Sequence, residues 1–153
     1  KVNTTNFNFT YNFKRDTKTG LNFDLNFSPQ YRLMKSSLER NTNSNGFVFG
    51  SNGSIEYFIN KTFKVYTNYS YTYEAATEAF DEKFEQFLLH PGVSKKFLKN
   101  ESLMLDFMIN DVLDQNKGFS RSASTSIFTQ RRYDTIRRYY MLKLSWVFTK
   151  MFL

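Results

Sequence analysis

The chain of 153 residues contains no cysteine, which excludes disulfide bonds, cysteine-based zinc sites and thiol nucleophiles. Only 2 residues are proline and 6 are glycine, too few for a flexible linker or a low-complexity segment. No run reaches the roughly 18 consecutive apolar residues that a membrane-spanning helix needs. The mean hydropathy of -0.53 does not argue against apolar strands, because a strand places its apolar residues at alternate positions.

The formal charge is +7, from 21 Lys and Arg against 14 Asp and Glu. In a soluble domain this excess would suggest nucleic acid or an anionic surface as the partner. The basic residues are scattered, however, and the tightest clusters are the pairs Lys95-Lys96, Arg131-Arg132 and Arg137-Arg138. No helical basic stripe and no RNA-binding signature accompanies them, so no nucleic-acid partner is expected.

The sequence is rich in aromatic residues, with 18 Phe and 10 Tyr, and most of them alternate with polar residues. A period of two is typical of a β-strand with one apolar face. The pattern predicts an all-β, antiparallel fold of about seven strands. The alternating segments lie at about residues 6–14, 21–33, 47–59, 63–74, 89–97, 103–110 and 140–148.

The predicted connections alternate in length. Short polar turns are expected at residues 15–20, 60–61 and 99–100, and longer connections at residues 41–46, 75–83 and 114–134. The longest, from about Asp114 to Asp134, is expected to be a polar loop. Gly50 and Gly53 interrupt the third segment and predict a β-bulge there, and Pro91 predicts an irregularity in the fifth.

Three features favour a transmembrane β-barrel over a soluble one. The apolar face is unusually aromatic, also near the strand ends, as expected where rings lie at two membrane interfaces. The opposite face is polar along whole strands, as a water-filled or plugged lumen requires. Short turns alternate with longer loops, as in bacterial outer-membrane barrels, and this alternation places the C-terminus in the periplasm.

The last predicted strand separates the two faces clearly. On the polar, lumen-facing row, Lys143 is expected to lie on the strand next to that of Asp106, so a structural cross-strand pair is expected, with substrate contact as the alternative. The opposite row is expected to contact outer-membrane lipid. That row consists of Tyr140, Leu142, Leu144, Trp146 and Phe148.

Seven strands leave two edges whose unpaired N–H and C=O groups cannot face lipid. We therefore expect other strands, N-terminal to Lys1, to close the barrel, and residues 1–153 to form its C-terminal portion. No apolar segment of signal-peptide length precedes the first strand pattern. Such a signal has then been removed, or the chain is the distal part of a longer protein.

The last third of the chain resembles a known family. The segments that carry the resemblance are residues 95–100 (Lys-Lys-Phe-Leu-Lys-Asn), 103–109, 111–118, 135–142 and 146–151. Together they resemble the C-terminal end of Bacteroidetes outer-membrane proteins of the TonB-dependent receptor type. The strong matches cover about residues 95–151, and over the rest of the chain the order and spacing of strands and turns are similar.

The resemblance implies a barrel of about 22 strands with an N-terminal plug domain, and substrate uptake driven by TonB. It also implies a surface lipoprotein as a candidate partner. Neither the plug nor the TonB-contacting segment lies in this sequence. The resemblance further implies that the apolar row of the last strand serves as the signal for the barrel-insertion machinery. Barrels of this family commonly end on an aromatic residue that this machinery recognises. Here Leu153 follows Phe152, which departs from that pattern, and both Phe148 and Phe152 have the lipid-facing parity.

Two other interpretations remain open from the sequence. The first is a barrel that does not transport and acts as a scaffold, adhesin or assembly component. The second is a soluble β-sandwich or lipocalin-like binding module. The upstream presence of a plug and a TonB-contacting segment separates the first from transport, and solubility without detergent separates the second from both.

No enzyme activity, cofactor or metal is expected. His90 is the only histidine and is expected to be an ordinary strand residue, so a serine–histidine arrangement has no support. The carboxylates Asp81, Glu82 and Glu85 are expected to lie in a solvated loop rather than to form a site. Arg131 and Arg132 are also expected in a solvated loop, with an anionic ligand or lipopolysaccharide as the alternative partner.

Overall fold

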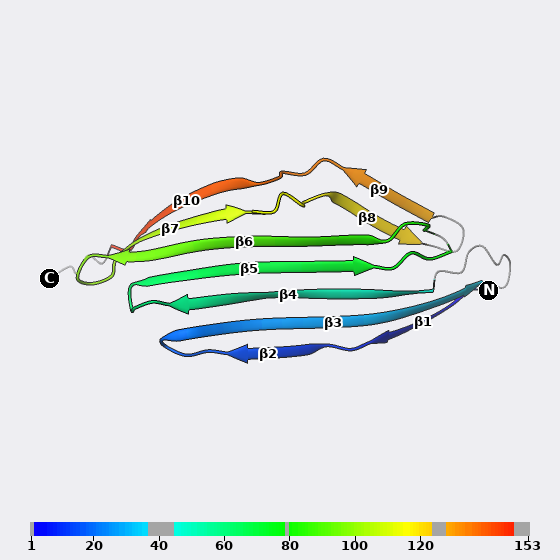
Figure 1. Ribbon diagram of the computed structural model, residues 1–153, viewed down its shortest axis with the longest axis horizontal. Helices are drawn as coiled ribbons and strands as arrows, with labels where there is room; N and C mark the ends of the chain where they lie inside the picture. Colours follow the sequence, from blue (N-terminus) through cyan, green and yellow to red (C-terminus); the bar gives the residue numbers. More distant parts are fainter. Residues whose placement is uncertain (1, 37–44, 79, 124–127, 149–153) are drawn as a thin grey trace.

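The computed structural model describes residues 2–36, 45–78, 80–123 and 128–148, and these residues form ten β-strands (Figure 1). In this part of the chain, no helix is long and apolar enough to cross a membrane. The predicted all-β class is confirmed. The strands are β1 (Val2–Asn8), β2 (Tyr11–Arg15), β3 (Gly20–Ser36), β4 (Gly46–Phe58), β5 (Phe63–Glu74), β6 (Phe84–Phe97), β7 (Leu103–Asn110), β8 (Gly118–Ala123), β9 (Phe128–Tyr133) and β10 (Tyr139–Trp146).

Most of the strands form one antiparallel sheet of eight strands in the order β1-β3-β4-β5-β6-β7-β10. Strand β2 follows β1 along the same edge of β3, so the sheet has seven strand positions, as the seven alternating segments predict. Strands β8 and β9 form a separate hairpin that continues beyond β7 and β10 (Figure 1). The sheet is open, with β1 and β2 at one edge and β10 at the other.

The register aligns the apolar residues of neighbouring strands on one face. Residues directly opposite each other in adjacent strands point to the same side of a sheet. Tyr31 of β3 is opposite Phe47 of β4, and Phe107 of β7 is opposite both Val93 of β6 and Leu142 of β10. The aromatic face therefore continues from β3 to β10, although its residues have odd numbers up to β7 and even numbers in β10.

Short and long connections lie at opposite ends of the sheet (Figure 1). The turns at residues 16–19, 59–62 and 98–102 lie at one end, called the turn end below. The other end, called the loop end, holds the end of β3, the start of β4, residues 75–78 and 80–83, and strands β8 and β9. The predicted alternation of connections is confirmed, although residues 41–44 of the predicted loop at 41–46 lie outside the described residues.

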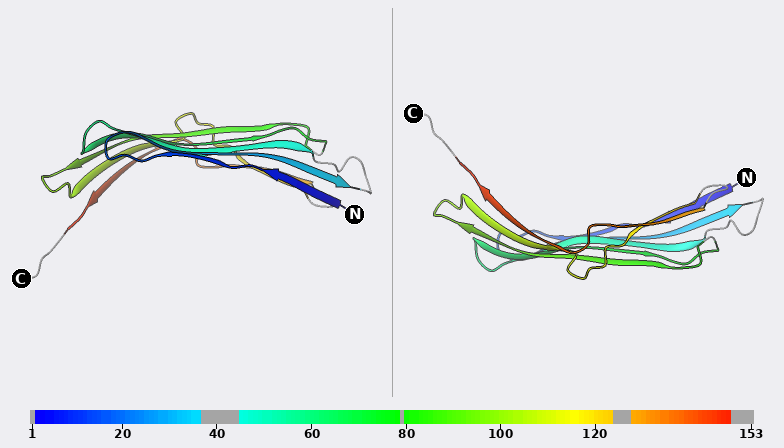
Figure 2. Two further views of the ribbon diagram at one scale, coloured as in Figure 1. Left: turned by 90° about the horizontal axis from the view of Figure 1, so that it is seen from below. Right: turned by 90° about the horizontal axis from the view of Figure 1, so that it is seen from above.

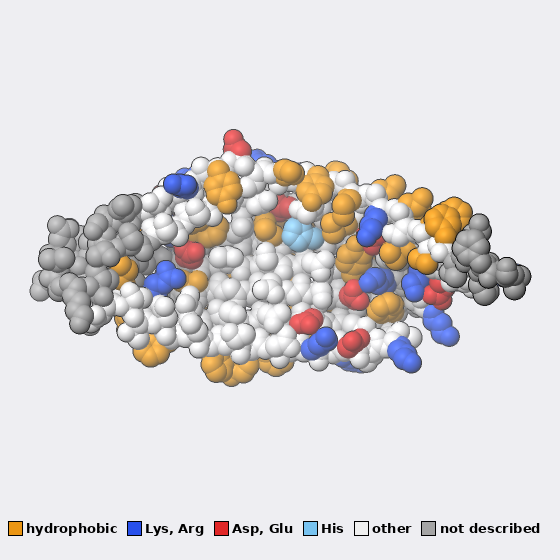
Figure 3. All heavy atoms as spheres, turned by 180° about the vertical axis from the view of Figure 1, so that it is seen from behind, with side chains coloured by type: hydrophobic (Ala, Val, Ile, Leu, Met, Phe, Trp, Pro, Cys, Tyr) orange, Lys and Arg blue, Asp and Glu red, His pale blue; other side chains and the backbone are white. Residues whose placement is uncertain are grey.

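The sheet is bowed, and its ends and its edges bend toward the same side (Figure 2). This concave side is the one seen in Figure 3, where the single histidine, His90, is visible in pale blue. The polar residues of the alternating strands thus lie on the concave face, and the aromatic residues lie on the convex face. Twisting and coiling of antiparallel strands produces curvature of this kind.

The prediction of a polar loop at residues 114–134 is wrong, because this segment contains the β8–β9 hairpin. Six residue pairs from Gly118 and Tyr133 to Ala123 and Phe128 define its register. The hairpin lies at the loop end, beyond the main sheet, where a single apolar ring of β8, Phe119, stacks on Phe84, so its strands carry no apolar row. The alternation that identified the other strands is therefore absent here.

The predicted bulge at Gly50 and Gly53 is also wrong, since β4 pairs continuously through both residues with β3 and β5. Gly53 is required because a Cβ atom there would strike the carbonyl oxygen of Asp24 and the Tyr69 ring.

The hydrogen-bonded ladder along the outer edge of β3 is interrupted between β1 and β2. The predicted irregularity at Pro91 is found on one side of β6 only. Pro91 stays paired with β5, whereas the pairing of β6 with β7 begins at Gly92 and does not include Pro91.

Candidate functional site

Neither face of the sheet is covered by another layer. Met34 is the one buried hydrophobic residue among those that the structure describes. The accessible surface is 11264 Å², whereas a compact monomer of 18.2 kDa exposes about 8100 Å² by the usual scaling with mass. A soluble domain buries its apolar sheet face against a second layer. The convex face of this sheet must therefore meet another apolar phase or another protein surface.

The last strand contributes a continuous apolar row to the convex face. The structure places Tyr140, Leu142, Leu144 and Trp146 there, opposite apolar residues of β7. Phe148 follows the end of β10. The exposed fractions are 66% for Tyr140, 68% for Leu142, 67% for Leu144, 56% for Trp146 and 74% for Phe148.

Aromatic rings form a belt on the convex face near the loop end. The rings of Phe49 and Tyr71 lie 6.0 Å apart, and those of Tyr71 and Phe87 lie 6.3 Å apart, so one chain of contacts crosses β4, β5 and β6. Phe107 and Tyr140 form another ring pair on the convex face between β7 and β10, with centroids 6.3 Å apart, and this pair lies nearer the turn end because Phe107 is opposite Val93. Such belts are typical of rings at the boundary between hydrocarbon and headgroups.

Charged residues bound the apolar part of the convex face on β6. Between Glu85 near the loop end and Lys95 near the turn end, the convex positions hold only apolar residues, from Phe87 to Val93. Ten residues of strand span about 33 Å, and a tilt of about 40° reduces this to about 25 Å along the membrane normal. That height matches the apolar band of outer-membrane barrels.

The concave face carries a ladder of amide side chains across the strands. The amide of Asn12 on β2 donates to Asn26 on β3 at 2.8 Å and to Asp24 at 2.9 Å. Asn26 donates to Asn52 on β4 at 3.4 Å. In Figure 3 the middle of this face shows few charged or hydrophobic side chains. Amides and hydroxyls that exchange hydrogen bonds with one another remain compatible with water, but they do not provide an apolar core.

Nearer the turn end, Tyr66 crosses a whole strand on the concave face. Its ring lies over Gly92 of β6, where a Cβ atom would overlap the ring, and its hydroxyl donates to Asp106 Oδ1 on β7 at 2.8 Å. Lys64 lies beside the same ring, with Nζ 5.3 Å from the centroid. The register places Lys143 directly opposite Asp106 on the neighbouring strand, but the hydrogen bond that the carboxylate accepts comes from Tyr66.

Sequence reasoning missed this arrangement, although one signal was present. Gly92 is the only glycine of β6, and Tyr66 is directly opposite it. A glycine opposite an aromatic residue allows the ring to lie flat on the neighbouring strand. The register that brings the two residues together could not be fixed from the sequence.

A second arrangement that sequence reasoning missed fixes the end of β7. Asp111 is fully buried, and its carboxylate accepts the backbone N–H groups of Gln115 at 3.1 Å and Asn116 at 2.7 Å. Its own N–H donates to Nδ1 of His90 at 3.0 Å. His90 is thus a structural acceptor on β6. The Asp111 carboxylate thus satisfies backbone N–H groups of the short polar loop after β7, which have no neighbouring strand to bond to.

The three carboxylates of the predicted cluster have different partners. Glu82 pairs with Arg132 of the β8–β9 hairpin at 2.8 Å. Glu85 accepts hydrogen bonds from Lys83 and from the Tyr71 hydroxyl, and the bond to Glu85 raises the pKa of Lys83. Within the described residues, no three His, Cys, Asp or Glu side chains are grouped to hold a metal ion.

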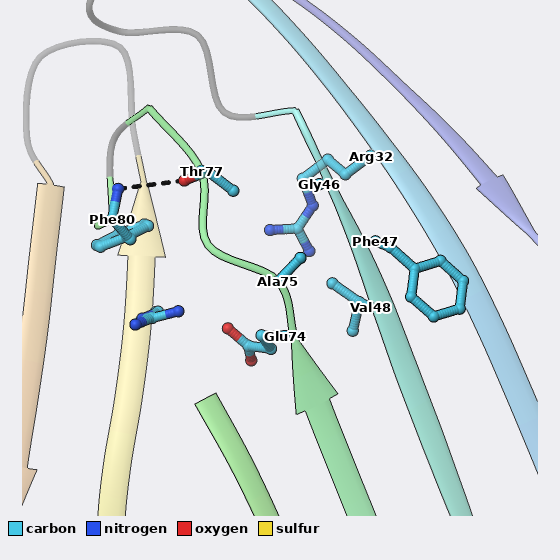
Figure 4. A pocket seen from close by; sticks show the side chains of 9 residues that line it. Arg32, Gly46, Phe47, Val48, Glu74, Ala75, Thr77 and Phe80 are labelled. Carbon is cyan, nitrogen blue, oxygen red and sulfur yellow. Dashed lines mark hydrogen bonds between the residues drawn. The ribbon is translucent and has the colours of Figure 1, made fainter. Parts of the chain in front are cut away.

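The hairpin is attached to the connection between β5 and β6 and borders a shallow pocket at the loop end. The Arg121 guanidinium lies 4.8 Å from the Phe119 ring centroid and donates to the carbonyl oxygen of Glu82. Figure 4 shows Arg32 and Glu74 extending into this pocket beside Phe80, whose N–H bonds to Thr77 Oγ1 at 3.1 Å. The pocket mixes charges of both signs and indicates no particular ligand.

Comparison with known proteins agrees with these two faces. The sequence model of the Outer membrane protein beta-barrel family matches residues 1–146. No curated protein and no solved structure matches the chain. An antiparallel sheet with an apolar convex face and a polar concave face is the wall of a barrel that faces lipid outside and a polar lumen inside. The chain belongs to the Outer membrane protein beta-barrel family, whose place is the outer membrane.

Proposed function

We propose that the chain forms part of the wall of an outer-membrane barrel that takes up a substrate, in the manner of a TonB-dependent receptor. The observation that carries the proposal is the concave face, where amide, hydroxyl and charged side chains of β2 to β7 outnumber apolar ones such as Met108. A lumen lined in this way accepts water, a plug domain or a polar solute. On this proposal the chain is not an enzyme, and its polar side chains serve passage and packing.

The strand directions support a larger barrel. All neighbouring strands of the sheet are antiparallel, so β1 and β10, at positions one and seven, run in the same direction. The two edges therefore cannot pair antiparallel with each other. An antiparallel barrel closes around this sheet only with an odd number of further strands. We propose that these strands and a plug belong to the same barrel and that residues 1–153 are its C-terminal portion.

The orientation in the membrane follows from the connections. Outer-membrane barrels have short periplasmic turns and longer external loops. We therefore propose that the turn end and the C-terminal end of β10 are periplasmic, and that the β8–β9 hairpin is external. The exposed apolar row of β10 is then available to the barrel-insertion machinery, and the hairpin is available to a surface lipoprotein.

The test measures the intact mass of the native protein from purified outer membranes and its binding to the purified periplasmic domain of TonB. A mass several times 18.2 kDa together with TonB binding is the expected result. A protein of 18.2 kDa, or a larger one that does not bind TonB, would contradict transport and favour a barrel that acts as a scaffold or adhesin.

A further inference from the structure

The charge of the chain is concentrated at the turn end. Residues 14–19, 59–64 and 95–102 contain eight Lys and Arg and two Asp and Glu, a balance of +6 within a chain of formal charge +7. The described residues of the loop-end connections and hairpin, 75–78, 80–83, 111–123 and 128–138, contain seven Lys and Arg and six Asp and Glu, a balance of +1. The two ends of the sheet thus differ strongly in charge.

Part of the positive charge at the turn end is neutralised by neighbours. Lys96 pairs with Glu101 inside these segments, while Lys14 and Lys64 pair with Asp24 and Glu56 outside them. Counting those two outer carboxylates still leaves +4. The five other cations are exposed and form no ion pair with any residue that the structure describes. They are Arg15, Lys18, Lys61, Lys95 and Lys99.

Their placement is regular. Each of the three turns holds one exposed lysine, namely Lys18, Lys61 and Lys99. Successive turns are two strands apart, which corresponds to about 10 Å. Arg15 and Lys95 lie just inside the turns on the convex face. The cations therefore form a row along the boundary of the apolar surface.

We infer that this row binds the headgroups of anionic phospholipids in the leaflet at the turn end. The inference rests on the proposed orientation of the barrel. Lys95 lies between Phe63 and Leu105 on the convex face, with Nζ 5.2 Å from the Phe97 ring, so its stem lies on apolar surface beside the lipid chains. Long cationic side chains in this position direct their charge to the headgroup level. An acidic soluble partner would have no need of cations on the convex face.

The expected strength follows from surface electrostatics. A cation next to an anionic membrane surface contributes about 1 kcal/mol, which corresponds to roughly a fivefold preference for an anionic over a zwitterionic lipid. One headgroup meets one or two of the cations in the row. We therefore expect a preference of about fivefold or somewhat more near each turn.

Trp146 provides a local probe, because it lies on the convex face opposite Leu103, next to the turn that holds Lys99. The native protein and its Trp146→Phe variant are reconstituted in vesicles of phosphatidylcholine containing brominated phosphatidylglycerol or brominated phosphatidylcholine. The difference between the two proteins gives the quenching of Trp146 alone. The comparison is repeated with Lys95→Gln/Lys99→Gln, and with Lys117→Gln/Arg131→Gln at the loop end as the matched control.

The expected result is stronger quenching by phosphatidylglycerol, a preference lost in Lys95→Gln/Lys99→Gln and kept in the loop-end control. Equal quenching by both lipids in the native protein would overturn the inference. So would a preference that survives Lys95→Gln/Lys99→Gln. If neither lipid quenches Trp146, the protein is not inserted, and the failure is that of the proposed function.

Discussion

The substitution Leu142→Arg tests the assignment of the convex face to lipid. Leu142 is 68% exposed and lies two residues from Tyr140 and four from Trp146 on the same row of β10. Two residues of a tilted strand correspond to about 5 Å along the membrane normal. The position is therefore inside the apolar band but nearer its edge than its middle.

An arginine on the lipid face costs about 2–4 kcal/mol at mid-membrane and about 0–1 kcal/mol at the interface. For Leu142→Arg we expect a loss of about 2 kcal/mol, close to a thirtyfold change in the ratio of folded to unfolded protein. The assay is urea unfolding of the native protein and the variant in phospholipid vesicles.

The neighbouring Met141 supplies the matched control, because it lies on the concave face opposite Met108. In a polar lumen, Met141→Arg costs less than about 1 kcal/mol, since the guanidinium stays hydrated. Equal losses in the two variants, or a larger loss in Met141→Arg, would refute the assignment of the faces.

Three further predictions concern the polar contacts. Gly92→Ala displaces the Tyr66 ring and costs about 1–3 kcal/mol in the same unfolding assay, and unchanged stability would contradict the contact. Asp111→Ala leaves two backbone N–H groups without their acceptor and costs about 2 kcal/mol, with faster hydrogen exchange at those two amides as the specific readout. Glu82→Gln removes an ion pair to Arg132 in which both side chains are 69% exposed, so its cost stays below about 1 kcal/mol, and a loss as large as that of Asp111→Ala would show that the hairpin is held mainly by this pair.

The strands of the sheet could be predicted because lipid and lumen impose a strict period of two on them. The aromatic row from Phe63 to Tyr73 identifies β5 without further information. The same reasoning failed for β8 and β9, because a hairpin with two polar faces has no such period. It also misread Gly53, whose missing side chain is required by the close approach of the Asp24 carbonyl oxygen and the Tyr69 ring rather than by a bulge.

The side-chain contacts were less predictable than the faces. Asp106 and Lys143 were correctly placed on adjacent strands, but Tyr66 reaches Asp106 from two strands away. Such a contact depends on register and on the gap left by a glycine, and neither follows from alternation. The role of Asp111 was hidden for a similar reason, since its partners belong to the turn that it stabilises.

The direction of curvature separates this sheet from a soluble barrel with the same alternation. In a lipocalin-like barrel the apolar residues point inward, so the concave face carries the core and the convex face meets water. Here the convex face carries the aromatic belt of Phe49, Tyr71 and Phe87, and the concave face carries the ladder of Asn12, Asn26 and the polar residues beyond it. A sheet curved in this sense cannot enclose its own apolar face, so only surrounding lipid or another protein can cover it. Because the family is one of outer-membrane barrels, we expect the free energy of folding of this chain to depend on the bilayer outside and on pairing partners for its two open edges.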